Sequence, residues 1–401
     1  MLTETQNNSG CCEPAKTPCT NEGLTEMLPI YKEAPQDEVC CGPPPGPASS
    51  PFERPGYRLC GFVEGFKDTP AGPVPRIKTK LERPDILGTI KVRLGVNRSQ
   101  YKVAPGLYSM GDVTPDSPVL VTANYKLTFD ILRKDLTGTH AWVLVLDTRG
   151  INVWCAAGKK TFSTQELIQR VKQTRLQKVV THRRLILPQL SATAVSGKAV
   201  KKGCGFKVTW GPIQARDVKS FIEAGLKADK AMRRVTFTFV ERLILVPVEL
   251  SFLRKYIFWI LLAGFILSGI GPGIFSIGLS WSRGLIMIAA CATGIFSGAV
   301  AAPVLLPWIP GRAFAVKGTL TGLLMGVAML MLLGKTLNLV AMAALIFLIV
   351  TISSYLAMNF TGSTPFTSPS GVEKEMRRYI PVQAAMAMVG LIMWVLSGLQ
   401  T

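Results

Sequence analysis

The middle of the chain carries the stretch Gly150-Ile-Asn-Val-Trp-Cys-Ala-Ala-Gly-Lys159, in which a cysteine is followed by small residues. The apolar residues at 151–154 predict a buried strand. Ser163 precedes Glu166 by three positions, which is the spacing of a capping box and predicts that a helix begins there. Cys155 is therefore expected at the point where a strand turns into a helix.

The surroundings of Cys155 suit a ligand that binds through sulfur. Small residues let a flat, bulky group approach the backbone closely, and three of them follow the cysteine: Ala156, Ala157 and Gly158. The nearby helix start, together with Lys159 and Lys160, would favour the thiolate over the thiol. A thiolate is a soft metal ligand.

Other interpretations of this stretch are weaker or remain open. Free cysteines are often buried, so Cys155 could simply belong to the core. A phosphate loop is excluded, because the glycine required five positions before Gly158 is replaced by Val153. A zinc site is not indicated, because the other candidate ligands lack ligand spacing to Cys155: Cys204, His140 and His182. A catalytic pair of Cys155 and His182 stays open, since such pairs are distant in sequence.

Two segments resemble known corrinoid proteins. The octet Asn152-Val-Trp-Cys-Ala-Ala-Gly-Lys159 resembles, letter for letter, the cap-helix motif of the corrinoid protein family of mercury methylation. The segment Cys204-Gly-Phe-Lys-Val-Thr-Trp-Gly-Pro-Ile-Gln-Ala-Arg-Asp217 is similar to part of the large subunit of the corrinoid iron–sulfur protein. The layout, a soluble domain followed by about five membrane spans, is also similar, and the resemblance covers residues from about 40 to the end.

This resemblance implies a function. Cys155 would be the lower axial ligand of the cobalt in a bound corrinoid, and the chain would transfer a methyl group from that cobalt to Hg(II). It implies two partners: a methyl-donating methyltransferase and a ferredoxin-like reductant with two 4Fe–4S clusters. The chain lacks the clustered cysteine spacing that such clusters need. A methyl carrier of one-carbon metabolism with another acceptor is the alternative.

Ligands of open α/β sheets bind beyond the carboxyl ends of the strands. Three predicted strand ends therefore form the expected rim of the pocket: Thr122 with Asn124, Trp154 with Cys155, and Trp210 with Gly211 and Pro212. Thr122 and Trp210 could equally serve in capping and packing. The residues expected to bind the corrinoid are Thr122, Asn152, Val153, Trp154, Cys155, Ala156, Ala157, Gly158, Lys159, Trp210, Gly211 and Pro212.

Length and composition divide the chain into three parts. The 401 residues suffice for two folded units, and the apolar excess lies after residue 255. Residues 1–55 are rich in Pro, Gly and Ser and are expected to be a disordered tail. The tail carries the vicinal pairs Cys11-Cys12 and Cys40-Cys41, either incidental or able to hold a thiophilic metal. Residues 56–250 predict a cytoplasmic α/β, Rossmann-like domain, which the resemblance implies to be corrinoid-binding, and residues 251–401 predict an all-α transmembrane domain.

The secondary structure expected within 56–250 alternates strands and helices, as in α/β proteins. Strands are predicted at 119–122, 142–146, 151–154, 179–180, 185–187, 206–210, 235–239 and 243–248. Helices are predicted at 125–136, 164–175 and 217–226.

The net charge of +20 points to an anionic membrane surface, because lysine and arginine crowd the segment before the first span. No signature of RNA or DNA binding is present. Nine cysteines at irregular spacing, without a secretory signal, argue against a disulfide scaffold and favour a reducing cytoplasm.

Five spans are predicted to begin near Tyr256, Leu285, Lys317, Leu337 and Ile380, none with a charge in mid-span. The basic connections 312–317 and 374–378 would lie in the cytoplasm with the large domain and the loop 359–372, leaving the C-terminus outside the cell membrane. A transporter with a regulatory soluble domain and Cys291 on its pathway is a further alternative. The absence of mid-span ionisable residues counts against it.

Overall fold

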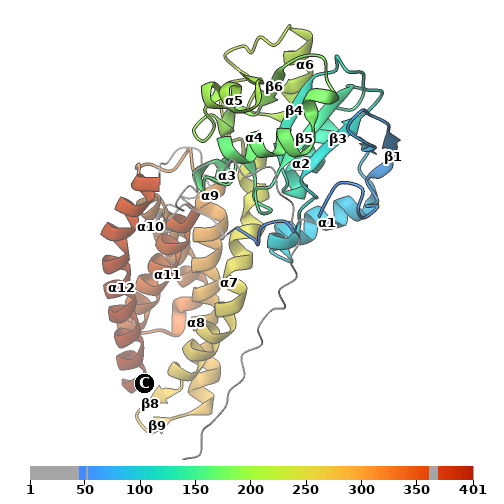
Figure 1. Cartoon of the computed structure of the whole chain (residues 1–401). Coiled ribbons are helices and arrows are strands. Elements are labelled where there is room, and N and C mark those ends of the chain that lie inside the picture. Colours follow the sequence, from blue (N-terminus) through green and yellow to red (C-terminus); the bar gives the residue numbers. More distant parts are fainter. Residues whose placement is uncertain (1–44, 51–52, 361–368, 401) are drawn as a thin grey trace, which may run out of the picture. The chain divides into compact units, whose positions relative to one another are not determined.

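The computed structural model describes residues 45–50, 53–360 and 369–400 (Figure 1). Several predictions concern residues outside these ranges. They concern the tail up to residue 44, for which disorder was predicted, with both of its vicinal cysteine pairs, and most of the loop 359–372.

A seven-stranded mixed sheet forms the first half of the described chain. Its strand order is β1 (Val63–Lys67), β2 (Val74–Ile77), β3 (Gly106–Met110), β5 (Ala141–Leu146), β4 (Val119–Ala123), β6 (Arg184–Leu187) and β7 (Lys207–Trp210). The last four strands are mutually parallel, whereas β3 runs antiparallel to β5. The predicted α/β class is confirmed, with a mixed sheet.

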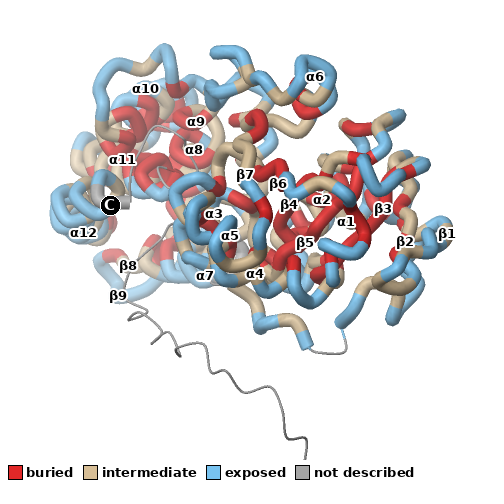
Figure 2. The backbone as a smooth tube through the Cα atoms, turned by 45° about the horizontal axis from the view of Figure 1, so that its top comes forward, coloured by how far each residue is buried: buried red, intermediate tan, exposed pale blue. Residues whose placement is uncertain are grey.

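Successive apolar residues of the central strands point to opposite faces of the sheet, so a hydrophobic core forms on each face. Trp142 and Leu144 of β5 pack on one face, with residues of α4 (Thr164–Gln173) and α5 (Gly197–Cys204). Val143 and Val145 pack on the other face, with α2 (Lys126–Asp135) and α6 (Val218–Glu223). β4 and β5 are consequently buried along their whole length, as central strands covered on both faces should be (Figure 2).

Four predicted strands and three predicted helices are confirmed within a few residues: β4, β5, β6, β7, α2, α4 and α6. The strands predicted at 151–154, 179–180, 235–239 and 243–248 are wrong. Residues 153–154 begin α3 (Val153–Gly158), because the Asn152 side chain caps it. The run 243–248 lies inside α7 (Phe239–Leu267), which a capping box of Thr238 and Glu241 starts. Short apolar runs suit buried helices as well as strands.

Buried ion pairs join α1 (Arg83–Arg93) to α2. Lys126 Nζ lies 2.7 Å from carboxylate oxygens of both Asp85 and Asp130, and Arg133 pairs with the same two carboxylates at 2.7 and 2.8 Å. Burial by itself would raise the pKa of Asp85. Hydrogen bonds from Lys126, the Glu82 N–H and Arg133 outweigh it and lower the pKa from 3.8 to about 2.

Replacing Asp85 with asparagine should lower the melting temperature of the full chain at neutral pH, at a cost of about 2 kcal/mol. Because the folded pKa lies below the unfolded one, the carboxylate stabilises the fold fully above about pH 4. That contribution disappears as the pH falls to about 2. Melting curves of both proteins in detergent should therefore differ at pH 7 and converge near pH 2. A constant difference across this range would contradict the assignment.

Long apolar helices form the second half: α7, α8 (Ile277–Phe296), α10 (Phe314–Leu333), α11 (Leu339–Asn359) and α12 (Pro369–Leu399). A five-residue π-helix, Ser297–Ala301, and the short α9 (Ala302–Val304) continue α8. Within the described residues, four helices are long and apolar enough to cross a membrane, and α7, which bends by 66°, makes a fifth if it counts as one span. The predicted helical region of about five spans is thereby confirmed.

One basic residue does not lie where the sequence predicted, whereas a second lies where its span was predicted to begin. The second span was predicted to begin near Leu285, which leaves Arg283 in the preceding connection. Arg283 instead lies within α8 and is buried. Its guanidinium stacks 4.4 Å from the Trp394 ring centroid and donates to Ser397 Oγ and the carbonyl oxygens of Ile270 and Trp394. Lys317 lies in the first turn of α10 and donates to carbonyls of the preceding connection. The prediction that Arg283 lies between two spans is thus wrong. Backbone carbonyl oxygens near the helix ends accept the hydrogen bonds of both basic side chains.

Three glycines spaced by four residues let α10 and α11 pack closely. A Cβ atom on Gly318 would lie 2.6 Å from the Ser353 carbonyl oxygen, and one on Gly322 would lie 2.8 Å from Ser353 Cβ. Gly326 faces Ile346 and Ile349 in the same way. Small residues at this spacing allow close helix packing within membranes.

Gly318→Leu should separate α10 from α11 and lower the melting temperature in detergent strongly, at a cost of about 3 kcal/mol or more. Gly278→Leu, in α8, is the matched control. A Cβ atom there would meet only Oγ of Ser276, the N-cap of the same helix, at 3.7 Å. The control should melt at or above the temperature of the unchanged protein. Equal melting temperatures for both variants would show that the helices do not pack through Gly318.

Candidate functional site

A pocket of about 440 Å³ opens along the sheet where β4, β6 and β7 end. These three strands are parallel, so their carboxyl ends meet at one edge. Six of the predicted binding residues line the pocket: Thr122, Asn152, Val153, Trp154, Gly211 and Pro212. The structure thus brings two predicted strand ends and the start of α3 together.

Helix α3 carries Cys155, which is not among the residues that line this pocket. The Asn152 side chain caps the helix by accepting a hydrogen bond from the Cys155 N–H at 2.8 Å. Cys155 is half-buried and Trp154 is 43% exposed, whereas Ala156 and Ala157 are buried against the core. Trp154 lines the pocket and Cys155 lies one residue further along the helix. Cys155 was predicted to lie at the end of a strand. It lies instead in the first turn of a helix.

The remaining predicted residues have different environments. Ala156 and Ala157 face the core, so they provide space for packing and no contact surface for a ligand. Gly158 ends α3 and is exposed, and Lys159 is the half-buried residue that follows it. Trp210 packs, partly buried, against the core at the end of β7.

Asn124, at the end of β4, organises the loop that leads to α3. It is fully buried, and its Oδ1 accepts hydrogen bonds from Thr148 N, Thr148 Oγ1 and Gly150 N at 2.9–3.0 Å. Its Nδ2 donates to Asp147 Oδ1 at 3.0 Å. Asn124 was expected on the rim of the pocket, but its polar atoms are used within the protein.

The expected capping box at α4 is only half formed. Ser163 Oγ accepts the Glu166 N–H at 3.2 Å, as predicted. The Glu166 carboxylate, which in a capping box would accept the Ser163 N–H, accepts instead from the Asp147 N–H at 2.8 Å and from the Arg170 side chain. The start of α4 is thereby tied to the same loop that Asn124 holds.

Both histidines lie at the opposite edge of the sheet. His182 precedes β6 and its ring contacts the Ser117 carbonyl oxygen at 2.9 Å, just before β4 begins. His140 precedes β5 and accepts the Asp112 N–H. Cys155 follows the carboxyl end of β5, so parallel strands separate it from both imidazoles. A catalytic pair of Cys155 and His182 is therefore excluded.

Several pocket residues escaped the sequence analysis. Leu187 ends β6 and Pro188 follows it, and Ile213 and Gln214 extend the segment after β7. The rule that ligands bind beyond strand ends would have identified Pro188, since β6 was predicted correctly. Asp135 of α2 also lines the pocket, and burial raises its pKa despite Lys134 and Arg216.

Comparisons with known proteins concern the sheet domain. Residues 79–222 match the family described as CO dehydrogenase/acetyl-CoA synthase delta subunit. The chain is also similar to the acetyl-CoA decarbonylase/synthase complex subunit gamma of Archaeoglobus fulgidus, with 32% identity over 143 residues, 34% of this chain and 30% of that protein. The subunit gamma of Methanopyrus kandleri is 34% identical over 128 residues, 31% of this chain and 27% of the relative.

The chain spans less than a third of the length of these relatives. The family match contains all candidate residues from Thr122 to Pro212 and ends before α7 begins. The chain therefore combines a domain distantly related to subunits of acetyl-CoA decarbonylase/synthase with, in the part that the structure describes, four to five long apolar helices.

Proposed function

We propose that the chain is a membrane-anchored, corrinoid-dependent methyltransferase that transfers a methyl group from cobalt to inorganic Hg(II). Cys155 would be the lower axial ligand of the cobalt. The observation that carries this proposal is the position of Cys155 in the first turn of α3, one residue from the pocket-lining Trp154. The octet around it is the one that resembles the mercury methylation family.

The residues present fit such a cofactor. The described part of the chain contains no group of three or more His, Cys, Asp or Glu side chains that could hold a bare metal ion. A corrinoid would bring its own ligands for the cobalt and would need only one from the protein, for which the Cys155 thiolate would be a suitable soft donor. The pocket supplies a largely apolar wall with few polar groups, as cofactor sites usually do.

Different side chains would contact the corrin ring and position Cys155. Thr122, Trp154, Gly211 and Pro212 would contact the ring from three elements. A Cβ on Gly211 would lie 3.1 Å from Ile186 Cγ2, so this strand end tolerates no larger residue without a shift. Asn152 would act as a positioning residue, because its cap fixes the turn that presents Cys155.

The chemistry explains why a sulfur ligand would matter. Hg(II) is an electrophile and must receive the methyl group together with both bonding electrons, which methyl bound to an electron-rich cobalt can supply. The Cys155 sulfur would donate charge from below the ring. A methyl-donating methyltransferase would load the cofactor, and a ferredoxin-like protein with two 4Fe–4S clusters would reduce it again.

Anaerobic purification of the full chain tests this proposal. We expect a coloured protein with about one cobalt per chain, since one thiolate provides one axial position. When methylated, it should form methylmercury from Hg(II). A colourless, cobalt-free protein that cannot be reconstituted would refute the proposal.

The similarity to acetyl-CoA decarbonylase/synthase subunits favours a second candidate, a corrinoid methyl carrier of one-carbon metabolism. The methylated protein distinguishes the two. Transfer to Hg(II) at a rate that exceeds transfer to an acetyl-CoA synthase acceptor supports mercury methylation, and the reverse order supports the carrier.

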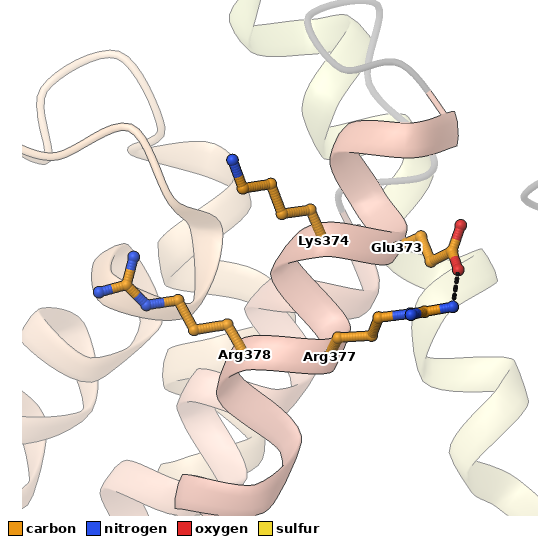
Figure 3. A pocket seen from close by; sticks show the side chains of 4 residues that line it. All are labelled: Glu373, Lys374, Arg377 and Arg378. Atoms are coloured by element: carbon orange, nitrogen blue, oxygen red, sulfur yellow. Dashed lines mark hydrogen bonds and ion pairs between the residues drawn. The ribbon is translucent and has the colours of Figure 1, made fainter.

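The helices would anchor this domain to the cell membrane, with the domain in the cytoplasm. The start of α12 lies beside α10, because Glu375 accepts a hydrogen bond from the Ala315 N–H at 2.7 Å. The end of α12 lies beside Ile270, because the Arg283 side chain donates to the carbonyl oxygens of both Ile270 and Trp394. Near its start, Lys374 and Arg378 extend to one side of the helix while Arg377 pairs with Glu373 (Figure 3). Clustered basic residues at one end of a bundle favour the cytoplasmic side.

Reporter fusions at residues 250 and 401 should therefore give opposite signals, because five passes would place the C-terminus outside. An alkaline phosphatase and a green fluorescent reporter at each position provide complementary readouts. The same location for both positions would mean an even number of passes, with α7 outside the bilayer.

A further inference from the structure

Helix α1 buries its acidic residue and exposes apolar residues. Its acidic residue Asp85 faces the protein and pairs with Lys126 and Arg133, whereas three apolar residues of the helix and the apolar residue at its C-cap are exposed. These four are Ile86, Leu87, Ile90 and Leu94, each about half exposed. They follow the spacing of one helical face, so together they form a continuous apolar stripe.

Basic residues accompany this stripe. Arg83 and Lys91 are exposed on the same helix, and Arg93 is half-buried in its last turn. The one acidic residue within α1, Asp85, is buried. An apolar face with lysine and arginine beside it is characteristic of helices that lie on anionic bilayers.

The end of α1 touches the helix that leads into the membrane. A Cβ on Gly95, directly after α1, would lie 2.5 Å from Ser251 Oγ of α7. Ser251 ends the first half of α7, and the second half begins at Tyr256. Tyr256 and Trp259 are both more than 60% exposed at this point. Exposed tyrosine and tryptophan at the beginning of an apolar span mark the membrane boundary.

We infer that α1 lies on the bilayer surface, with its apolar stripe among the lipid acyl chains and its basic residues at anionic headgroups. The contact at Ser251 places α1 beside the boundary where α7 enters the membrane. This inference is independent of the corrinoid. It implies that the sheet domain is held against the membrane by a second attachment, in addition to its connection to α7.

A photoreactive benzophenone amino acid at position 90 tests the inference in the full chain. The chain is inserted into vesicles of phosphatidylcholine and phosphatidylglycerol, illuminated, and analysed for lipid adducts by mass spectrometry. A probe at Lys172, exposed on α4, is the matched control. We expect about tenfold more lipid adduct at position 90 than at position 172, because only an interfacial helix contacts acyl chains.

A charge within the stripe should remove this contact. Leu87→Asp should reduce the adduct at position 90 about fivefold, whereas Lys172→Asp should leave it unchanged. Leu87 is more than half exposed, so its variant should keep the melting temperature of the unchanged protein. Equal adducts at positions 90 and 172, or a probe at 90 that attaches to a second copy or another protein, would overturn the inference.

Discussion

Cys155→Ala should reduce methylmercury formation to background while the chain stays folded and inserted. The substitution removes one half-buried sulfur, which costs about 1 kcal/mol in a site of this kind. The Asn152 cap survives, because it uses the backbone N–H of residue 155. Corrinoid could still bind through the pocket walls, but its visible spectrum should change without the sulfur–cobalt bond. Cobalt content, spectrum and product are measured on the same preparation.

Two further variants sharpen this test. Cys155→Ser should fail as the alanine variant does, because a hydroxyl stays protonated near neutral pH and is a poor soft ligand. Cys60→Ala is the matched control, since Cys60 is an exposed cysteine of the same domain that lies before β1. It should retain the spectrum and the activity. Unchanged spectrum and activity in Cys155→Ala would assign that cysteine to packing alone.

Asn124→Ala should destabilise the sheet domain and disorder the loop that presents α3. The substitution leaves the buried N–H groups of Thr148 and Gly150 without their acceptor. Each buried donor without a partner costs about 1–3 kcal/mol, so a loss of about 3 kcal/mol is expected. The apparent melting temperature and the corrinoid content of the full chain should both fall. Thr128→Ala, which changes a hydroxyl on the pocket wall, should have little effect on melting.

A reciprocal exchange separates hydrogen bonding from charge. Asn124→Asp places a second carboxylate where the amide now donates to Asp147 at 3.0 Å, so it should also destabilise the protein. Adding Asp147→Asn restores a donor and acceptor pair and should recover part of the lost stability. A double-mutant cycle measures this coupling. Additive effects of the two substitutions would show that the side chains do not interact.

The sequence alone determined the features that depend on local periodicity. Short apolar runs identified β4 and β5, and the amphipathic pattern identified α2 and α4. Hydropathy located the helical region, because a span of apolar residues is visible without knowledge of its neighbours. The octet around Cys155 identified the residues on which the functional proposal rests.

Tertiary structure decided which of these residues meet. The order of the strands places the ends of β4, β6 and β7 at one pocket and His182 at the opposite edge. Contacts between distant elements allow Arg283 to be buried in α8 and turn the apolar stripe of α1 outward. A local sequence pattern indicates how much of a segment is buried, but it does not identify the elements against which that segment packs. Polar partners far away in the chain decide whether a charge can be buried, and they cannot be identified from spacing alone.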